Sequence, residues 1–280
     1  MDIDFVKMHG AGNDYIYIDL MKNKYDLDFS RLATYIADRH FGVGGDGLVL
    51  IMKGSKADYR MRMFNIDGSE AEMCGNAIRC VAKYLFDYGY KEGDEVDIET
   101  LAGIKKLKVL ELDGEGKVKK VRVNMGRPTL EGEKIPINID GAPVVDVEIL
   151  GYQGTAVSMG NPHIVFFVDE ISDKMVLQDG PEIEKHKLFP KKTNVEFVKV
   201  LDKQNLEMRV WERGSGETLA CGTGACATGV AAVLNGLTER KVNVHALGGI
   251  LTVEWDENSG EVFLSGPAEE VFKGVYYYNL

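Results

Sequence analysis

Two of the four cysteines in the sequence stand in matching surroundings, each immediately before a glycine. Cys74 lies in "EMCGN" and Cys221 in "LACGTG", and Cys80 and Cys226 follow a few residues later. A thiol can act as an acid or base, bind a metal, form a disulfide or simply fill the core. Because the following glycine lets backbone approach a ligand closely, these surroundings favour chemistry at Cys74 and Cys221.

The two cysteines belong to an internal repeat that runs through most of the chain. "GNDYIYID" matches "GNPHIVFFVD", "DGLVLI" matches "TNVEFV", and "FNIDGSEAEMCGN" matches "WERGSGETLACGTG". The matches keep the same order at a nearly constant offset of about 147 positions. We therefore predict two homologous halves, residues 1–126 and 127–266, with the tail 267–280 returning to the first half as a strand.

Each half is predicted to be a strand barrel wrapped around one central helix. "DYIYID", "LKVLEL", "VVDVEIL" and "HIVFFV" are rich in β-branched and aromatic residues at strand length. Apolar residues recur at helical spacing after Cys74, and "GTGACATGVAAVL" after Cys221 is small or apolar all round, which is typical of an enclosed helix. The expected fold class is α/β (α+β), with two pseudo-symmetric halves and the active site in the cleft between them.

A thiol at a helix N-terminus has a distinctive chemistry. Free backbone N–H groups and the helix dipole stabilise the thiolate, so we expect a lowered pKa for both thiols. The same N–H groups can bind a carboxylate. Two such thiols suit inversion of a carbon next to a carboxylate, because one can remove a proton from one face while the other supplies a proton to the opposite face.

The sequence points to no cofactor and no metal. It has no dinucleotide-binding GxGxxG loop and no evident lysine motif for pyridoxal phosphate. It also has no CxxC or HxxxH pair of the kind that binds zinc. Cys80 and Cys226 fall on other sides of their helices from the leading cysteines, so we predict that both are core thiols.

Polar residues at related positions of the two halves are candidates for ligand contacts. Asn13 corresponds to Asn161, Asn65 to Glu212, and Gly47 to Asn194. Asparagine is also a common turn residue, and a lone histidine such as His163 or a Glu212–Arg213 pair can be structural. Their places in the repeat favour a location at the site.

Composition limits the range of partners. The chain has 280 residues, a formal net charge of -11 and 45% hydrophobic residues, which is typical of a soluble globular protein. An acidic chain is a poor partner for nucleic acid or an anionic membrane. Because no signal peptide or membrane-length apolar run is evident, we expect a cytoplasmic protein with free thiols.

At this point the motifs resemble a known family. "GAGNDY", "FNIDGSEAEMCGNAIRC", "MGNPHIVFF", "TNVEF" and "ERGSGETLACGTGACA" closely resemble diaminopimelate epimerase over nearly the whole chain. The resemblance implies a cofactor-independent enzyme that interconverts L,L- and meso-2,6-diaminopimelate on the route to lysine and peptidoglycan. It also implies a homodimer whose protomer closes over the substrate.

The resemblance also assigns roles to individual residues. It implies that Cys74 and Cys221 are the acid/base pair and that His163 and Glu212 tune the thiols. The substrate-binding positions that it implies are Asn13, Asn65, Gly75, Asn76, Asn161, Asn194, Glu212, Arg213, Gly222 and Thr223. Many family members have a substrate-contacting glutamine where this chain has Gly47, and Phe272 lies near an aromatic dimer contact.

Two alternatives remain at the level of the sequence. Proline racemase and hydroxyproline epimerase resemble this fold and use two cysteines, but they carry "MCGH" and "SPCGTG" where this chain has "MCGN" and "LACGTG". The related phenazine-type isomerases lack the cysteine pair. A non-catalytic amino-acid-binding protein is the alternative of another class, and it would not need two thiols at helix starts.

Overall fold

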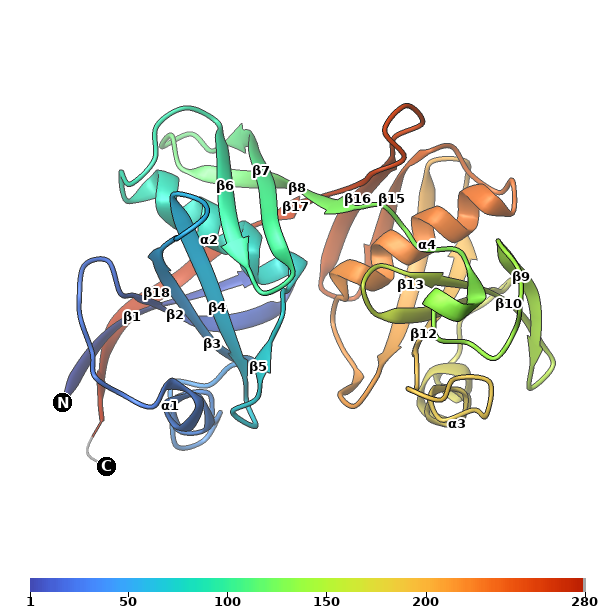
Figure 1. Ribbon diagram of the computed structural model, residues 1–280, viewed down its shortest axis with the longest axis horizontal. Coiled ribbons are helices and arrows are strands. Elements are labelled where there is room, and N and C mark those ends of the chain that lie inside the picture. Colours follow the sequence, from blue (N-terminus) through green and yellow to red (C-terminus); the bar gives the residue numbers. More distant parts are fainter. Residues whose placement is uncertain (279–280) are drawn as a thin grey trace. The chain divides into compact units, whose positions relative to one another are not determined.

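The computed structural model describes residues 1–278, and the chain divides into two compact units (Figure 1). Unit 1 comprises Met1–Val123 together with the residues from Gly266 onward, and unit 2 comprises Asn124–Ser265. In the sequence, the repeat had placed the divisions after residues 126 and 266. Among the described residues, no helix has the length and apolar character needed to cross a membrane.

The described part of unit 1 is rich in strands and has two helices. Its strands are β1 (Asp2–Gly10), β2 (Asn13–Asp19), β3 (Gly47–Lys53), β4 (Tyr59–Asn65), β5 (Glu70–Ala71), β6 (Glu95–Thr100), β7 (Gly103–Leu112), β8 (Val118–Gly126) and β18 (Glu269–Tyr277). Its helices are α1 (Phe29–Ile36) and α2 (Gly75–Asp87). The strands pair in the order β18–β1–β2–β3–β4–β6–β7–β8, and β5 also pairs with β4.

Unit 2 repeats this plan. Its strands are β9 (Val144–Ile149), β10 (Tyr152–Ser158), β11 (Pro162–Phe167), β12 (Asn194–Val200), β13 (Asn205–Glu212), β14 (Gly216–Glu217), β15 (Lys241–Ala246), β16 (Gly249–Trp255) and β17 (Val262–Pro267). Its helical segments are η1 (Gly132–Lys134), η2 (Met175–Asp179), α3 (Gly180–Glu184) and α4 (Gly222–Leu234). The strands pair in the order β9–β10–β11–β12–β13–β15–β16–β17, and β14 pairs with β13.

The two orders agree strand by strand, including which pairs are parallel. In unit 1 the parallel pairs are β2–β3 and β4–β6, and in unit 2 they are β11–β12 and β13–β15. Strand β18 pairs with β1 as β9 pairs with β10, so the end of the chain supplies in unit 1 the strand that precedes the repeat in unit 2. The predicted mixed α/β fold class is confirmed.

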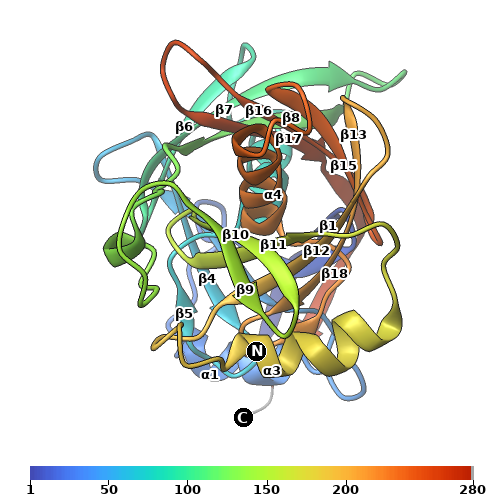
Figure 2. The same cartoon turned by 90° about the vertical axis from the view of Figure 1, so that its right-hand side faces the viewer.

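One helix lies at the centre of each unit. Helix α2 packs against β1, β2, β7 and β18, and α4 packs against β10, β11, β12, β15 and β16. Figure 2 shows α4 with strands around it. Ala225, Ala227, Val230 and Ala231 of α4 are all fully buried, which confirms the enclosed helix predicted from its small and apolar sequence.

Strand alternation determines which residues face the central helix. Successive side chains of a strand point to opposite faces. On β12, Val195 and Phe197 belong to the apolar core that also contains Ile183 of α3. Asn194 and Glu196 therefore lie on the other face, toward α4. The polar residues of β12 that could take part in a site are thus the ones that face α4.

Candidate active site

Cys74 is the residue immediately before α2. Its backbone is extended (φ -133°, ψ 124°), and its sulfur accepts a hydrogen bond from the backbone N–H of Ala77 at 3.5 Å, so it caps the helix. The thiol donates to Asn13 Oδ1 at 3.3 Å. Asn13 in turn donates from Nδ2 to Asp46 at 2.7 Å. The thiol is partly exposed.

Cys221 has the same position at the start of α4. Its backbone is extended (φ -108°, ψ 115°), and its sulfur accepts from the backbone N–H of Gly224 at 3.4 Å. Thr223 Oγ1 lies 3.5 Å from the sulfur. The side chain is only 5% exposed, so this thiol is more enclosed than Cys74. Both thiols thus cap equivalent helices through the same local geometry.

The first turn of α2 is held by a buried arginine that the sequence analysis missed. Arg79 is fully buried, and its guanidinium donates to the carbonyl of Gly75 at 3.0 Å and to Asn76 Oδ1 at 2.9 Å. It also donates to the carbonyl of Pro267 at 3.3 Å. Arg79 therefore orders the backbone that follows Cys74. A charged residue in the helix predicted to lie at the centre of the unit was the signal available in the sequence.

Asn65 ends β4, and the structure places it opposite Gly47 of β3. Its Nδ2 donates to Ser69 Oγ at 3.0 Å. A Cβ atom added at Gly47 would lie 2.1 Å from the carbonyl oxygen of Phe64, so this backbone leaves no space for a side chain. The glutamine that the resemblance led us to look for at this position therefore has no counterpart here.

His163 and a second residue missed from the sequence, Glu196, form a buried pair in unit 2. His163 Nδ1 lies 2.7 Å from Glu196 Oε1, and neither side chain is exposed. His163 Nε2 lies 3.1 Å from Asn161 Oδ1, and Asn161 Nδ2 donates to Thr223 Oγ1 at 3.3 Å. These contacts join β11 and β12 to the first turn of α4.

Asn194 holds the loop that carries Arg213. Its Oδ1 accepts from the backbone N–H of Arg213 at 2.9 Å, and its Nδ2 donates to the carbonyl of Pro162 at 2.9 Å. The Arg213 side chain is exposed, and Nη1 donates to the carbonyl of Lys191 at 3.2 Å. The guanidinium therefore keeps free donors for a ligand carboxylate.

Glu212 lies at the end of β13, close to Cys221. Thr218 Oγ1 donates to Glu212, and a hydrogen bond from Cys221 also reaches its carboxylate. Burial raises the pKa of the Glu212 carboxyl above its ordinary value, against the opposing effect of these donors and of His163. Glu212 and His163, which the resemblance implied to tune the thiols, lie in the same unit as Cys221. The structure adds Glu196 to this group.

The expectation of a lowered pKa is wrong for Cys221. Burial, followed by the nearby carboxylates of Glu212 and Glu196, raises the pKa of this thiol well above its ordinary value. Donation from Thr223 and from the backbone of Gly224 acts in the opposite direction but is outweighed. Burial and like charge both disfavour the ionised form, and here they exceed the effect of the helix N-terminus.

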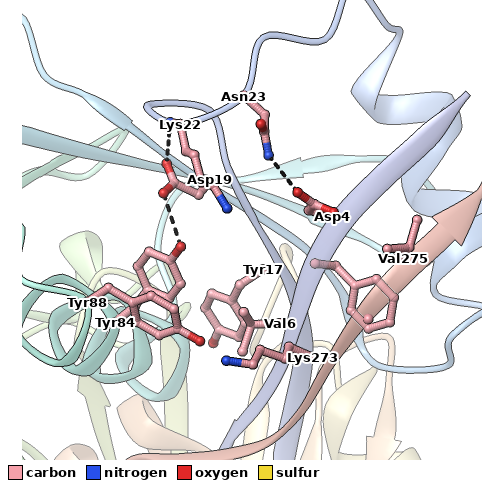
Figure 3. Close-up of a pocket in the computed structure, with 12 residues that line it drawn as sticks. Asp4, Val6, Tyr17, Asp19, Lys22, Asn23, Tyr84, Tyr88, Lys273 and Val275 are labelled. Atoms are coloured by element: carbon pink, nitrogen blue, oxygen red, sulfur yellow. Dashed lines mark hydrogen bonds between the residues drawn. The ribbon is translucent and has the colours of Figure 1, made fainter.

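A separate cavity of about 400 Å³ in unit 1 involves none of the predicted site residues (Figure 3). It lies between β1, β2, β18 and α2, where Asp19 accepts from Tyr84 at 3.0 Å and from the backbone of Lys22 at 3.1 Å. Across residues 1–278, no cluster of three or more His, Cys, Asp or Glu side chains is arranged to hold a metal ion.

Comparison with known proteins places this geometry in a family. The sequence profile described as "Diaminopimelate epimerase" matches residues 5–131 and 155–271. A curated diaminopimelate epimerase from Acetivibrio thermocellus is 53% identical over 96% of this chain and 97% of its own length. Another, from Moorella thermoacetica, is 52% identical over 97% of this chain and 98% of its own. The chain belongs to the diaminopimelate epimerase family.

Solved structures that are less than 25% identical to this chain share its fold. A probable proline racemase from Agrobacterium radiobacter superposes with a TM-score of 0.70 at 16% identity, covering 99% of this chain and 93% of that one. A hydroxyproline epimerase from Agrobacterium vitis gives 0.67 at 15% identity, covering 98% and 90%. A PhzF-family phenazine biosynthesis protein from Bacillus anthracis gives 0.69 at 17%, covering 99% and 100%. These similarities show the fold of the chain and nothing about its activity.

Proposed function

We propose that this chain is a cofactor-independent epimerase that interconverts L,L- and meso-2,6-diaminopimelate, a step in the biosynthesis of lysine and peptidoglycan precursors, with Cys74 and Cys221 as the acid/base pair. The observation that carries the proposal is the duplicated cysteine cap. In a chain of the diaminopimelate epimerase family, both thiols begin equivalent buried helices and accept from the same helical N–H position.

The chemistry follows from the difference between the two substrates, which lies at one α-carbon. One thiolate removes the α-proton and becomes a thiol, and the other thiol donates its proton to the opposite face and becomes a thiolate. The carbanion formed between these steps places negative charge on the α-carboxylate. Backbone N–H groups at Gly75–Asn76 and Gly222–Thr223, at the helix starts, are suited to stabilise that charge.

The second amino-acid end of diaminopimelate does not react and needs its own contacts. Arg213 is suited to its carboxylate, because a guanidinium can bind both oxygens at once. Asn194 supports this role by holding the Arg213 backbone at 2.9 Å. Asn13, Asn65 and Asn161 complete the proposed polar contacts. Proline lacks this distal end, so the proposed contacts discriminate against it.

Exchange of the α-proton with solvent tests the proposed activity. The full-length protein is incubated in D₂O with L,L-diaminopimelate or with L-proline, and the α-proton signal is followed by proton NMR. We expect deuterium to enter diaminopimelate and not proline. The absence of exchange with diaminopimelate, or faster exchange with proline, would overturn the assignment and favour the proline racemase alternative.

A homodimer and a cytoplasmic location complete the proposal. Val271, Phe272, Val275 and Tyr277 on β18 are apolar or aromatic residues with large exposed fractions, and Phe272 packs edge-on against Phe5 at 5.8 Å. Exposed apolar residues gathered on one strand are suited to a subunit contact. Size-exclusion chromatography with light scattering, on the wild type and on Phe272→Asp, tests this part: the variant is expected to be monomeric.

A further inference from the structure

Glu196 is a buried acidic residue that the packing of the β-strands does not require. It lies in the middle of β12 with no exposed surface, and its Oε1 lies 2.7 Å from His163 Nδ1. Its Oε2 is buried and has no hydrogen-bond partner among the described residues. Burying a carboxylate oxygen without a partner is costly, so its retention calls for a functional reason.

The carboxylate lies directly beneath the turn that carries Cys221. A Cβ atom added at Gly224 would lie 2.6 Å from Glu196 Oε1 and 3.3 Å from Cys221 Sγ. The backbone N–H of Gly224 is the group that donates to the sulfur, at 3.4 Å. Only glycine at this position lets the helix start approach the carboxylate so closely.

Unit 1 shows that the fold forms without such an acid. In the repeat, Val49 stands at the position of Glu196 and Ala77 at the position of Gly224. The strand register is the same, since Val49 pairs with Tyr17 as Glu196 pairs with Val165. The helix start is also the same, because Cys74 caps α2 as Cys221 caps α4.

We propose that Glu196 is a positioning residue that keeps Cys221 in its thiol form in the free enzyme and holds His163 with its Nδ1–H toward the carboxylate. The inference rests on the proposed function, in which Cys221 is one of the two acid/base groups. Under it, the free enzyme begins with Cys221 as the proton donor and Cys74 as the base, and the two roles are exchanged in the reverse direction. His163 keeps Nε2 on the side of Asn161 and the first turn of α4.

The charged groups around Cys221 support this assignment. Glu196 faces it from β12 and Glu212 from β13, and His163 on β11 lies against Glu196. Burial and the two carboxylates raise the pKa of the Cys221 thiol, and negative charge beside a sulfur disfavours the thiolate. Thr223 supplies an opposing hydrogen bond from the helix itself.

The test separates the charge of Glu196 from its size. Glu196→Gln keeps an oxygen that can accept from His163 Nδ1–H but removes the negative charge. The free, full-length variant is treated with iodoacetamide over a range of pH, and alkylation of each cysteine is resolved by peptide mass spectrometry. Because only the thiolate reacts, we expect the midpoint for Cys221 to fall by about one pH unit, with about tenfold faster alkylation below it.

The controls make the outcome decisive. Cys74 in the same sample is expected to keep its wild-type profile, and so is Cys221 in Glu207→Gln, which removes an exposed carboxylate from β13. Glu196→Val, which copies unit 1, is expected to fold, to show the same shift, and to epimerise more slowly than Glu196→Gln because His163 loses its acceptor.

An unchanged Cys221 midpoint in both Glu196 variants would overturn the proposal. Failure of both variants to fold would also overturn it, since Glu196 would then be a structural residue. Alkylation needs no substrate, so this result is independent of the proposed activity. A wild-type protein that exchanges no diaminopimelate proton would contradict the proposed function and leave the thiol shift measurable.

Discussion

Cys74 and Cys221 cap two equivalent helices, but the buried charges beside those helices have opposite signs. In unit 1 the fully buried cation of Arg79 binds Gly75 and Asn76 in the first turn of α2. In unit 2 the fully buried carboxylate of Glu196 lies beneath the first turn of α4. The repeat pairs Arg79 with Cys226 and Glu196 with Val49, so neither charge has a counterpart in the other unit.

The comparison separates what duplication preserves from what catalysis requires. Strand order, register and the cysteine cap are common to both units, so they fix where each thiol lies. A reaction with two thiols must begin with one protonated and one ionised. Different buried charges at equivalent helix starts are a direct way to create that difference. The predictions below therefore remove the shared feature first and the differences afterwards.

The largest expected effect comes from removing either thiol. Cys74→Ala and Cys221→Ala are each expected to lower the rate of epimerisation by at least about 10²- to 10⁴-fold, because each removes a proton-transfer group. Initial rates with L,L-diaminopimelate, measured by NMR, check this. Near wild-type turnover in either single variant would exclude the two-thiol mechanism and would favour a binding role for the unaffected unit.

The next effect concerns the contact between Gly224 and Glu196. Gly224→Ala introduces a Cβ atom 2.6 Å from Glu196 Oε1 and is expected to lower the free energy of unfolding by about 1–3 kcal/mol. The same substitution in a Glu196→Val background restores the alanine–valine pair of unit 1, so its cost is expected to fall. Urea unfolding of the four proteins measures the coupling. Equal costs in both backgrounds would show that the carboxylate does not determine the glycine.

A smaller effect is expected from replacing Glu212, the other carboxylate beside Cys221. Glu212→Asn copies the residue of unit 1, Asn65, and removes a charge that raises the pKa of the Cys221 thiol. The pH midpoint for alkylation of Cys221 should therefore fall, by about one unit. Glu217→Gln, on neighbouring β14, serves as the control. A midpoint that rises would contradict the sign of this charge effect.

The smallest effect concerns Cys80, a core thiol without a proposed role. Burial raises its pKa from 9.0 to about 11. The folded protein therefore holds this proton more tightly than the unfolded chain, and the resulting stability is present below pH 9.0 and is lost as the pH rises toward about 11. The difference in unfolding free energy between Cys80→Ala and wild type is expected to shrink over this range. Activity at neutral pH should be unchanged.

The sequence predicted the elements whose residues repeat. The matching blocks around Cys74 and Cys221 led to two similar halves, a central helix in each and a mixed α/β fold, because a repeat of buried residues imposes the same packing twice. The small and apolar residues after Cys221 likewise predicted an enclosed helix. These inferences needed only the repeat and the residue pattern within each half.

The sequence did not reveal the residues that break the repeat. Glu196 lies within "TNVEFV" and aligns with Val49 in the repeat. A comparison of the halves that looks for identical residues gives no weight to such a difference. A single acid in a strand that is otherwise buried was the available signal. The raised pKa of the Cys221 thiol was also missed, since it depends first on burial and then on the carboxylates of Glu212 and Glu196, which lie on two strands.

The position of deuterium in the first turnovers tests the two-thiol mechanism most directly. L,L-diaminopimelate is converted to a small extent in D₂O, and the product and the recovered substrate are separated and analysed for label. One thiol removes the substrate proton while the other delivers a solvent deuteron, so the product is expected to be labelled and the recovered substrate to keep its proton. Recovered substrate that gains deuterium as fast as the product would show that one group serves both faces, and it would contradict the mechanism.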